Sequence, residues 1–139
     1  MVDDALVKAA LDRTLGATDF VGLGHKYEGK VRDNYSRGTR RYIVVTDRIS
    51  AFDRVLGTIP FKGQVLNRLA GWWFERTREV APNHFVRLAD PNVLECLECE
   101  PILVEMVVRA YCAGSTSTSL WTHYARGGAL FVGTRCRRV

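Results

Sequence analysis

Three clusters of charged and hydroxyl residues in this 139-residue chain could bind an anionic ligand. The first is Gly29-Lys30-Val31-Arg32-Asp33, in a stretch with strand-like alternation. Glycine lets a backbone approach a ligand closely, and a lysine held beside it on a strand is a natural phosphate contact. Lys30 and Arg32 are expected on one face of that strand. The alternative is that Lys30 is a solvated residue at a sheet edge.

The second cluster follows directly on an apolar run and spans Thr46 to Asp53, sequence TDRISAFD. It contains two carboxylates, a guanidinium and two hydroxyls, and polar loops at strand ends are where binding groups gather. Asp47, Ser50 and Asp53 are the candidates. The alternative, weighed evenly, is a capped turn in which Asp47 or Ser50 caps a short helical segment.

The third cluster lies at the end of the run 102–111, whose residues alternate between an apolar face and a face that carries Glu105 and Arg109. The run leads into Gly114-Ser115. A guanidinium fork beside backbone N–H groups and a hydroxyl suits phosphate or carboxylate. The alternative is a surface pair between Arg109 and Glu105, which would stabilise little.

Helix and strand signals predict the elements that position these clusters. Asp3 or Asp4 caps a first helix that Gly16 closes, and Ser36-Arg37-Gly38-Thr39 is a hairpin turn. Pro82 follows a long amphipathic helix. The expected strands are 26–35, 40–46, 54–59, 84–88, 93–98 and 102–111; the expected helices are 64–80 and 120–126; and 46–54 is expected to be a polar loop.

The long helix carries an apolar stripe with a charged far side. The stripe consists of Val65, Leu69, Trp72, Trp73 and Arg76, and core packing is the expected role of its two tryptophans. Together the elements predict an α+β domain, with an antiparallel sheet and the long helix packed against it.

The composition, 47% hydrophobic and 25% charged, is typical of a soluble globular protein. No apolar run approaches the roughly 20 residues of a membrane helix, and the N-terminus resembles neither a secretory signal nor a transit peptide. A cytoplasmic protein without a membrane partner is expected. The net charge is +5, but Arg135, Arg137 and Arg138 concentrate it at the end, which argues against nucleic-acid binding.

The four cysteines are Cys96, Cys99, Cys112 and Cys136. A single C-x-x-C without a second pair or spaced histidines is a poor zinc site. Reduced thiols are expected, and no metal ligand is assigned.

Four motifs in order resemble the SAICAR synthetase (phosphoribosylaminoimidazole-succinocarboxamide synthase) family. They are YEGKVRD, TDRISAFD, the connection Ile59-Pro60…Lys62-Gly63, and VEMVVRAYCAGSTSTSLWTHY. The last contains V-V-R-x-Y-x-x-G-S, a signature of that family, with Ala110 in place of the usual glycine. The similarity covers about Lys26 to Gly128.

This resemblance implies a SAICAR synthetase-like ATP-binding fold and a carbon–nitrogen ligase of purine biosynthesis. Such enzymes join L-aspartate to carboxyaminoimidazole ribonucleotide (CAIR), using ATP and Mg2+, and release ADP and phosphate. By this resemblance, Lys30 corresponds to the family's lysine at the ATP phosphates, and Glu105 lies in the segment that binds adenine and ribose. Arg109 and Ser115 correspond to positions that bind the 5′-phosphate of the ribonucleotide. The residues assigned to the CAIR base and carboxylate are Asp47, Ser50 and Asp53.

The resemblance stops after Gly128, which divides the chain into 1–128, the family-like part, and 129–139, a basic tail. Family members continue further, so the chain is expected to be an N-terminal portion that lacks the C-terminal part, with its own activity in doubt. The alternative is a non-catalytic nucleotide-binding or basic nucleic-acid-interacting module. Homo-oligomerisation is left open.

Overall fold

The computed structural model describes residues 3–104, 108, 110–128, 130–131 and 134–135. The chain divides into two compact units, Met1–Glu100 and Pro101–Val139, each considered by itself. Glu105, Arg109 and most of the basic tail lie outside the described residues. The expected boundary after Gly128 concerned family resemblance, and it stays a prediction.

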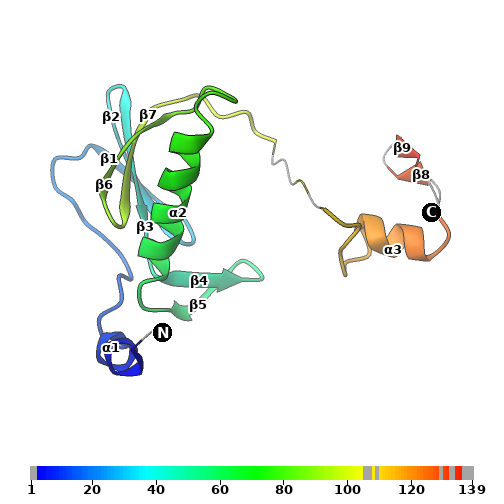
Figure 1. Ribbon diagram of the computed structural model, residues 1–139, viewed down its shortest axis with the longest axis horizontal. Helices are drawn as coiled ribbons and strands as arrows, with labels where there is room; N and C mark the ends of the chain where they lie inside the picture. The colour runs from blue at the N-terminus through cyan, green and yellow to red at the C-terminus, as the bar shows by residue number, and fades with distance from the viewer. Residues whose placement is uncertain (1–2, 105–107, 109, 129, 132–133, 136–139) are drawn as a thin grey trace. The chain divides into compact units, whose positions relative to one another are not determined.

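The first unit is built on a five-stranded antiparallel sheet of order β1-β2-β3-β7-β6 (Figure 1). Its strands are β1 (His25–Glu28), β2 (Arg32–Arg37), β3 (Arg40–Val45), β6 (Phe85–Asp90) and β7 (Val93–Leu97). The hairpin turn expected before Arg40 connects β2 to β3, and the expected turn around Pro91 connects β6 to β7. The α+β class with an antiparallel sheet is confirmed.

The first predicted strand is in fact two strands. β1 and β2 pair in antiparallel register up to Glu28 and Asp33, and the chain turns at 29–31 between them. Lys30 therefore lies in a turn and does not share a strand face with Arg32. Gly29 permits this turn, because a Cβ there would lie 3.2 Å from the carbonyl oxygen of Arg32.

The segment expected to be a polar loop is a second hairpin, β4 (Arg48–Ala51) and β5 (Arg54–Thr58). Its two turn residues, Phe52 and Asp53, have φ angles of 49° and 63°. Positive φ at both positions is the requirement of the tight hairpin turn that matches strand twist. Neither the loop nor the capped helical turn predicted the hairpin, because neither turn residue is a glycine.

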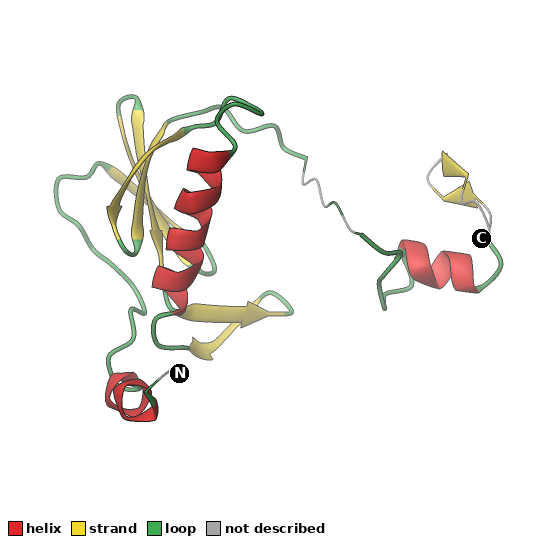
Figure 2. Cartoon of the chain, viewed as in Figure 1, coloured by secondary structure: helices red, strands yellow, loops and turns green. Residues whose placement is uncertain are grey.

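The long helix is α2 (Lys62–Arg76), which lies against one face of the sheet (Figure 2). It is shorter than the expected 64–80, because the backbone N–H and hydroxyl of Thr77 both bind the carbonyl oxygen of Trp73 and close its last turn. A core of Phe85, Leu94 and Cys96 lies between sheet and helix, with Ile43, Ala70 and Phe74 packed around it.

The helix face that packs on the sheet is not the apolar stripe expected from the sequence. The buried residues of α2 are Gly63, Asn67 and Gly71. A Cβ on Gly63 would lie 2.2 Å from the carbonyl oxygen of Val45, so only glycine fits where the helix begins. Small residues on this face let helix and sheet approach closely; Phe74 reaches the core, whereas Trp72 and Trp73 face elsewhere.

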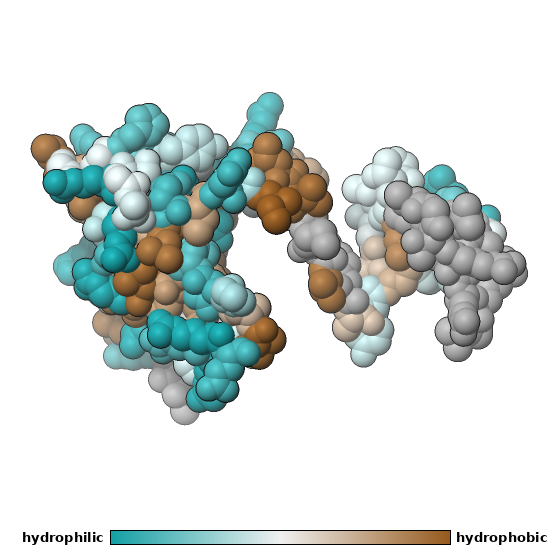
Figure 3. Space-filling view, turned by 90° about the horizontal axis from the view of Figure 1, so that it is seen from above, coloured by the Kyte–Doolittle hydropathy of each residue, from teal (hydrophilic) through white to brown (hydrophobic). Residues whose placement is uncertain are grey.

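The predicted core role of the two tryptophans in that stripe is therefore wrong within this unit. Trp72 and Trp73 are 45% and 54% exposed, and Val65 and Leu69 are more than half exposed. The space-filling view likewise shows apolar side chains at the surface, among hydrophilic ones (Figure 3). Within the described part of the chain, no helix is both long and apolar enough to cross a membrane.

The N-terminal helix, α1 (Asp4–Ala10), begins as expected at Asp3, whose carboxylate accepts a hydrogen bond from the amide of Ala5. The helix ends at Ala10, before the expected end at Gly16. The chain beyond it extends because Leu15 and Gly16 bind Asp47 and Arg48.

The second unit contains α3 (Leu120–Ala125), β8 (Leu130–Phe131) and β9 (Thr134–Arg135). The short helix was expected; Ser119 caps its start, and Gly127, with φ 86°, follows its end. None of the described residues of 102–111 belongs to a strand. Alternation alone does not make a strand, because an extended backbone also needs a partner for its hydrogen bonds.

Candidate functional site

The turn at 29–31 is closed by a hydrogen bond from the Gly29 amide to the carbonyl oxygen of Arg32, 2.7 Å long. The Val31 carbonyl accepts hydrogen bonds from the amide and hydroxyl of Thr46. Among the hydrogen bonds of the described residues, none involves the amide N–H of Lys30 or Val31. The turn thus presents two unpaired N–H donors and one ammonium, a set of donors suited to phosphate oxygens.

Arg48 holds this turn from beneath. Its guanidinium donates to the carbonyl oxygens of Lys30 (3.0 Å), Gly29 (2.9 Å) and Gly16 (2.6 Å), and to the carboxylate of Asp33 (2.7 Å). The Arg48 side chain is only 8% exposed. A buried arginine is stable in such a position only when its charge is paired and its N–H groups are bound.

Asp33 supplies the opposite charge and is fully buried. Burial by itself raises the pKa of this carboxyl, but hydrogen bonds from Arg48 and from the hydroxyl and amide of Thr18 outweigh it. The net effect is a pKa below the ordinary aspartate value, so Asp33 is ionised at neutral pH. Asp33 therefore acts as an internal counter-ion.

Lys30 and Asp53 come together at the surface. The Lys30 ammonium forms a hydrogen-bonded ion pair with the Asp53 carboxylate, which lies in the turn of the β4–β5 hairpin. The hydrogen bond from Lys30 and its charge lower the pKa of Asp53. Two predicted site residues from separate motifs thus meet, and both remain more than half exposed and open to a ligand.

Asp47 occupies a different environment from the other two candidates of its motif. It is buried, and its two carboxylate oxygens accept hydrogen bonds from the amides of Leu15 (2.9 Å) and Gly63 (2.8 Å). Negative charge near a helix start is favourable, and here it fixes α2 to the end of β3. Ser50 is exposed on β4 opposite Val55.

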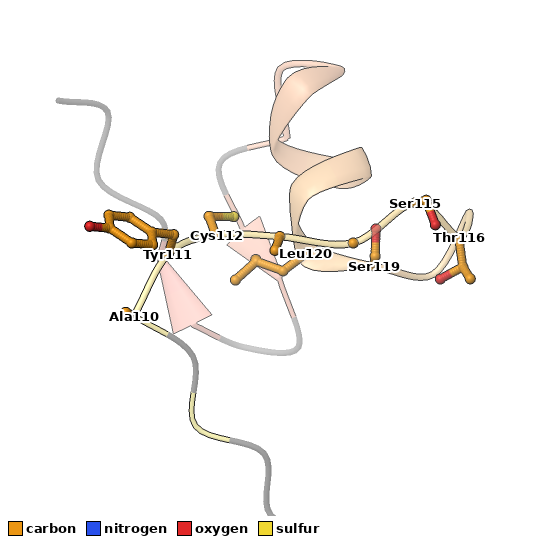
Figure 4. Close-up of a pocket in the computed structure, with 9 residues that line it drawn as sticks. Ala110, Tyr111, Cys112, Ser115, Thr116, Ser119 and Leu120 are labelled. Atoms are coloured by element: carbon orange, nitrogen blue, oxygen red, sulfur yellow. The ribbon is translucent and has the colours of Figure 1, made fainter. Parts of the chain in front are cut away.

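In the second unit, the described residues enclose a hollow of about 750 Å³ between residue 110 and the start of α3. Ser115 and Ser119 lie toward one end of it and the ring of Tyr111 toward the other (Figure 4). Gly114 has φ 132°, and a Cβ there would lie 2.3 Å from that of Ser119. The loop therefore depends on glycine for its course, as expected of a small-residue binding turn.

Metal binding has no ready donor set in what the structure describes: no group of three or more His, Cys, Asp or Glu is placed to hold an ion. Cys96, Cys99 and Cys112 are free thiols.

Reasoning from sequence assigned no role to Arg48, although it lies in the second cluster, and it overlooked Thr18. Local patterns carried no signal for either residue. Their importance comes from contacts with residues 15 to 32 positions away, which only the folded chain brings together.

Comparison with known proteins matches residues 25–131 to the protein-family model described as SAICAR synthetase. The chain is 53% identical over 105 residues to phosphoribosylaminoimidazole-succinocarboxamide synthase of Legionella pneumophila (strain Lens), covering 76% of this chain and 34% of that protein. It is 46% identical over 136 residues to the chloroplastic synthase of Vigna aconitifolia, covering 95% and 40%. The chain thus spans less than half the length of these curated relatives.

Solved structures agree. A structure titled SAICAR synthase superposes with a TM-score of 0.76 at 27% identity, covering 90% of this chain and 49% of that one. A second, SAICAR-synthase from Saccharomyces cerevisiae complexed with SAICAR, gives a TM-score of 0.75 at 27% identity, covering 90% and 48%.

Proposed function

The chain belongs to the SAICAR synthetase family, and from this premise we propose that it serves the ATP-dependent joining of L-aspartate to CAIR. The products are SAICAR, ADP and phosphate. In this reaction ATP supplies the phosphoryl group that activates the imidazole carboxylate for attack by the aspartate amine. The residues of this chain bind and orient the phosphate-bearing substrates.

The observation that carries the proposal is the donor set of the 29–31 turn. Lys30 offers an exposed ammonium, and within the described part of the chain the amides of Lys30 and Val31 have no hydrogen-bond partner. Phosphoryl transfer relies mainly on positioning and charge stabilisation, so donors aimed at the phosphates are what this step requires. We assign the ATP phosphates to this turn.

The β4–β5 hairpin supplies the neighbouring groups. Ser50 and Asp53 are exposed and belong to it, so we assign them to the CAIR base and carboxylate. Asp47 acts differently in this proposal: its oxygens are bound by backbone amides, so it supports the hairpin and α2 rather than contacting substrate.

The loop before α3 is assigned to the ribonucleotide 5′-phosphate. Ser115 provides a hydroxyl beside Gly114, whose positive φ angle favours glycine at that position. Arg109 and Glu105 keep their proposed roles at the phosphate and at the ATP adenosine, although both lie outside the described residues. The cytoplasm is the proposed compartment.

Magnesium enters the proposal only as the ion that accompanies ATP. The described residues offer no cluster of protein ligands for it, so no step is assigned to a protein-bound metal.

Isothermal titration of the 139-residue chain with ATP tests the nucleotide assignment. Lys30→Ala should weaken binding by about tenfold, the loss of one charged hydrogen bond to phosphate. Lys8→Ala is the matched control, because it removes an exposed lysine from α1. Equal affinity of Lys30→Ala and Lys8→Ala would contradict the assignment. A turnover assay with CAIR, aspartate and Mg-ATP separates a ligase from a nucleotide-binding module.

A further inference from the structure

The guanidinium of Arg48 binds two consecutive carbonyl oxygens of the proposed phosphate-binding turn, those of Gly29 and Lys30. We propose that Arg48 is a positioning residue that orients the turn for ATP without touching the nucleotide. This inference rests on the proposed function for its ligand, but the orienting contacts themselves do not depend on it.

The geometry of the peptide bond explains how Arg48, on one side of the turn, determines which N–H groups the turn exposes on its other side. No cis peptide bond occurs among the described residues, and in a trans peptide the C=O and the following N–H point in opposite directions. Because Arg48 draws the carbonyls of Gly29 and Lys30 toward itself, the N–H groups of Lys30 and Val31 point away from it. These are the two amides of the turn that have no hydrogen-bond partner among the described residues.

Only an arginine can make this set of contacts. The planar guanidinium has five N–H donors in a fixed fork, and here they reach four acceptors, at Gly16, at the adjacent Gly29-Lys30 and at Asp33. A lysine ammonium at the same position has three donors at one point and cannot span them. Arg48→Lys therefore keeps the charge beside Asp33 while releasing part of the turn.

The buried carboxylate of Asp33 supplies the counter-charge that Arg48 needs from within the protein. Asp33 is fully buried and bound to Thr18 as well as to Arg48, so the guanidinium is paired and held by contacts within the protein. Arg48 itself is almost inaccessible to solvent and does not reach the surface as Lys30 does.

The test measures turn order and ATP affinity separately in the full chain. In Arg48→Lys, amide exchange at Gly29, whose N–H closes the turn, should be at least about tenfold faster, and the ATP dissociation constant should rise by about tenfold. Leu94→Val, a core change in β7 remote from the turn, is the stability control and should leave both within about twofold. Arg48→Lys with parental exchange and parental affinity would overturn the proposal.

A second variant covers the case in which Arg48→Lys does not fold. Asp33→Asn combined with Arg48→Gln removes both buried charges together, which avoids leaving either unpaired. It should fold, and it should show the same fast exchange and weak ATP binding. If the parent itself does not bind ATP, the proposed function fails, and exchange at Gly29 alone decides the role of Arg48.

Discussion

Lys30 and Asp53 form an ion pair between two turns, although 23 positions separate them in the chain. The Asp53 carboxylate thus pairs with the same ammonium that is proposed to bind phosphate. Under the proposed function, a nucleotide phosphate and the Asp53 carboxylate compete for the charge of one ammonium.

Asp53→Asn should therefore strengthen ATP binding, by about two- to fourfold, because exposed ion pairs are weak. The gain should shrink at high salt, since screening weakens the competing pair. Titration calorimetry at two salt concentrations measures both effects. Asp12→Asn removes the same charge from an exposed site near α1 and serves as the control. Weaker ATP binding in Asp53→Asn would show that this carboxylate assists the nucleotide.

The buried pair of Asp33 and Arg48 should make stability depend on acid pH. The pKa of Asp33 is lowered in the folded protein, so the pair stabilises fully above the unfolded-state pKa of about 3.9. This contribution is lost as the pH falls through the lower folded-state value. Urea unfolding from pH 7 to pH 2 should show that loss, and Asp33→Asn should abolish that part of the profile. At pH 7, Asp33→Asn should cost about 3 to 5 kcal/mol, because Arg48 loses its anionic partner.

Alanine substitutions at Gly63 and Gly57 compare a closely packed glycine with one that faces open space. Gly63→Ala places a Cβ 2.2 Å from the Val45 carbonyl oxygen and 2.5 Å from the Asn92 side chain, so α2 must shift. We expect a loss of about 1 to 3 kcal/mol, as for overpacking elsewhere. Gly57→Ala meets nothing within 4 Å and should change the free energy of unfolding by less than about 0.5 kcal/mol. Similar values for the two variants in denaturant unfolding would contradict the close approach of α2.

Two leucines test which side of α2 is the core. Leu94 is 4% exposed beneath the helix, and Leu69 is 51% exposed on its outer stripe. Leu94→Ala should cost about 2 to 5 kcal/mol, whereas Leu69→Ala should cost about 1 kcal/mol or less. If thermal unfolding shows the larger loss for Leu69→Ala, another surface covers the stripe in solution.

Cysteine labelling should follow burial. Cys96 is fully buried, and burial raises the pKa of its thiol to about 11, so it should resist alkylation in the folded protein. Cys99 and Cys112 are exposed and should react within minutes. Mass mapping after a short iodoacetamide pulse, with and without urea, measures all three. Rapid labelling of Cys96 without urea would indicate that β7 opens easily.

Much of the first unit could be predicted from local patterns. Alternation before Thr46 predicted the central hairpin, Asp3 predicted the first helix start, and the turn at Pro91 separated two strands as expected. Alternation failed at 102–111, where the described residues form no strand, because pairing depends on a second segment as well as on the pattern.

The candidate site could also be predicted only in part, because local patterns reveal the chemistry of side chains but not their tertiary contacts. The motifs identified Lys30 and Asp53 as candidates, because glycine, lysine and clustered acids have recognisable chemistry. They placed Lys30 on a strand and left Arg48 without a role. The four acceptors of Arg48, at Gly16, Gly29-Lys30 and Asp33, all lie at least 15 positions from it in the sequence.

By itself, the sequence determined the family, the α+β class and the chemical types of the candidate site residues, since these depend on local patterns and on motif order. The tertiary structure decided where those residues lie. It turned Gly29-Lys30-Val31 into a loop held by Arg48, buried Asp47 with its carboxylate bound to the Gly63 amide, and set Gly63 and Gly71 rather than Trp72 and Trp73 against the sheet. The physical reason is that burial and hydrogen bonding are settled by contacts between distant segments, and a local pattern does not specify which partner a side chain will meet.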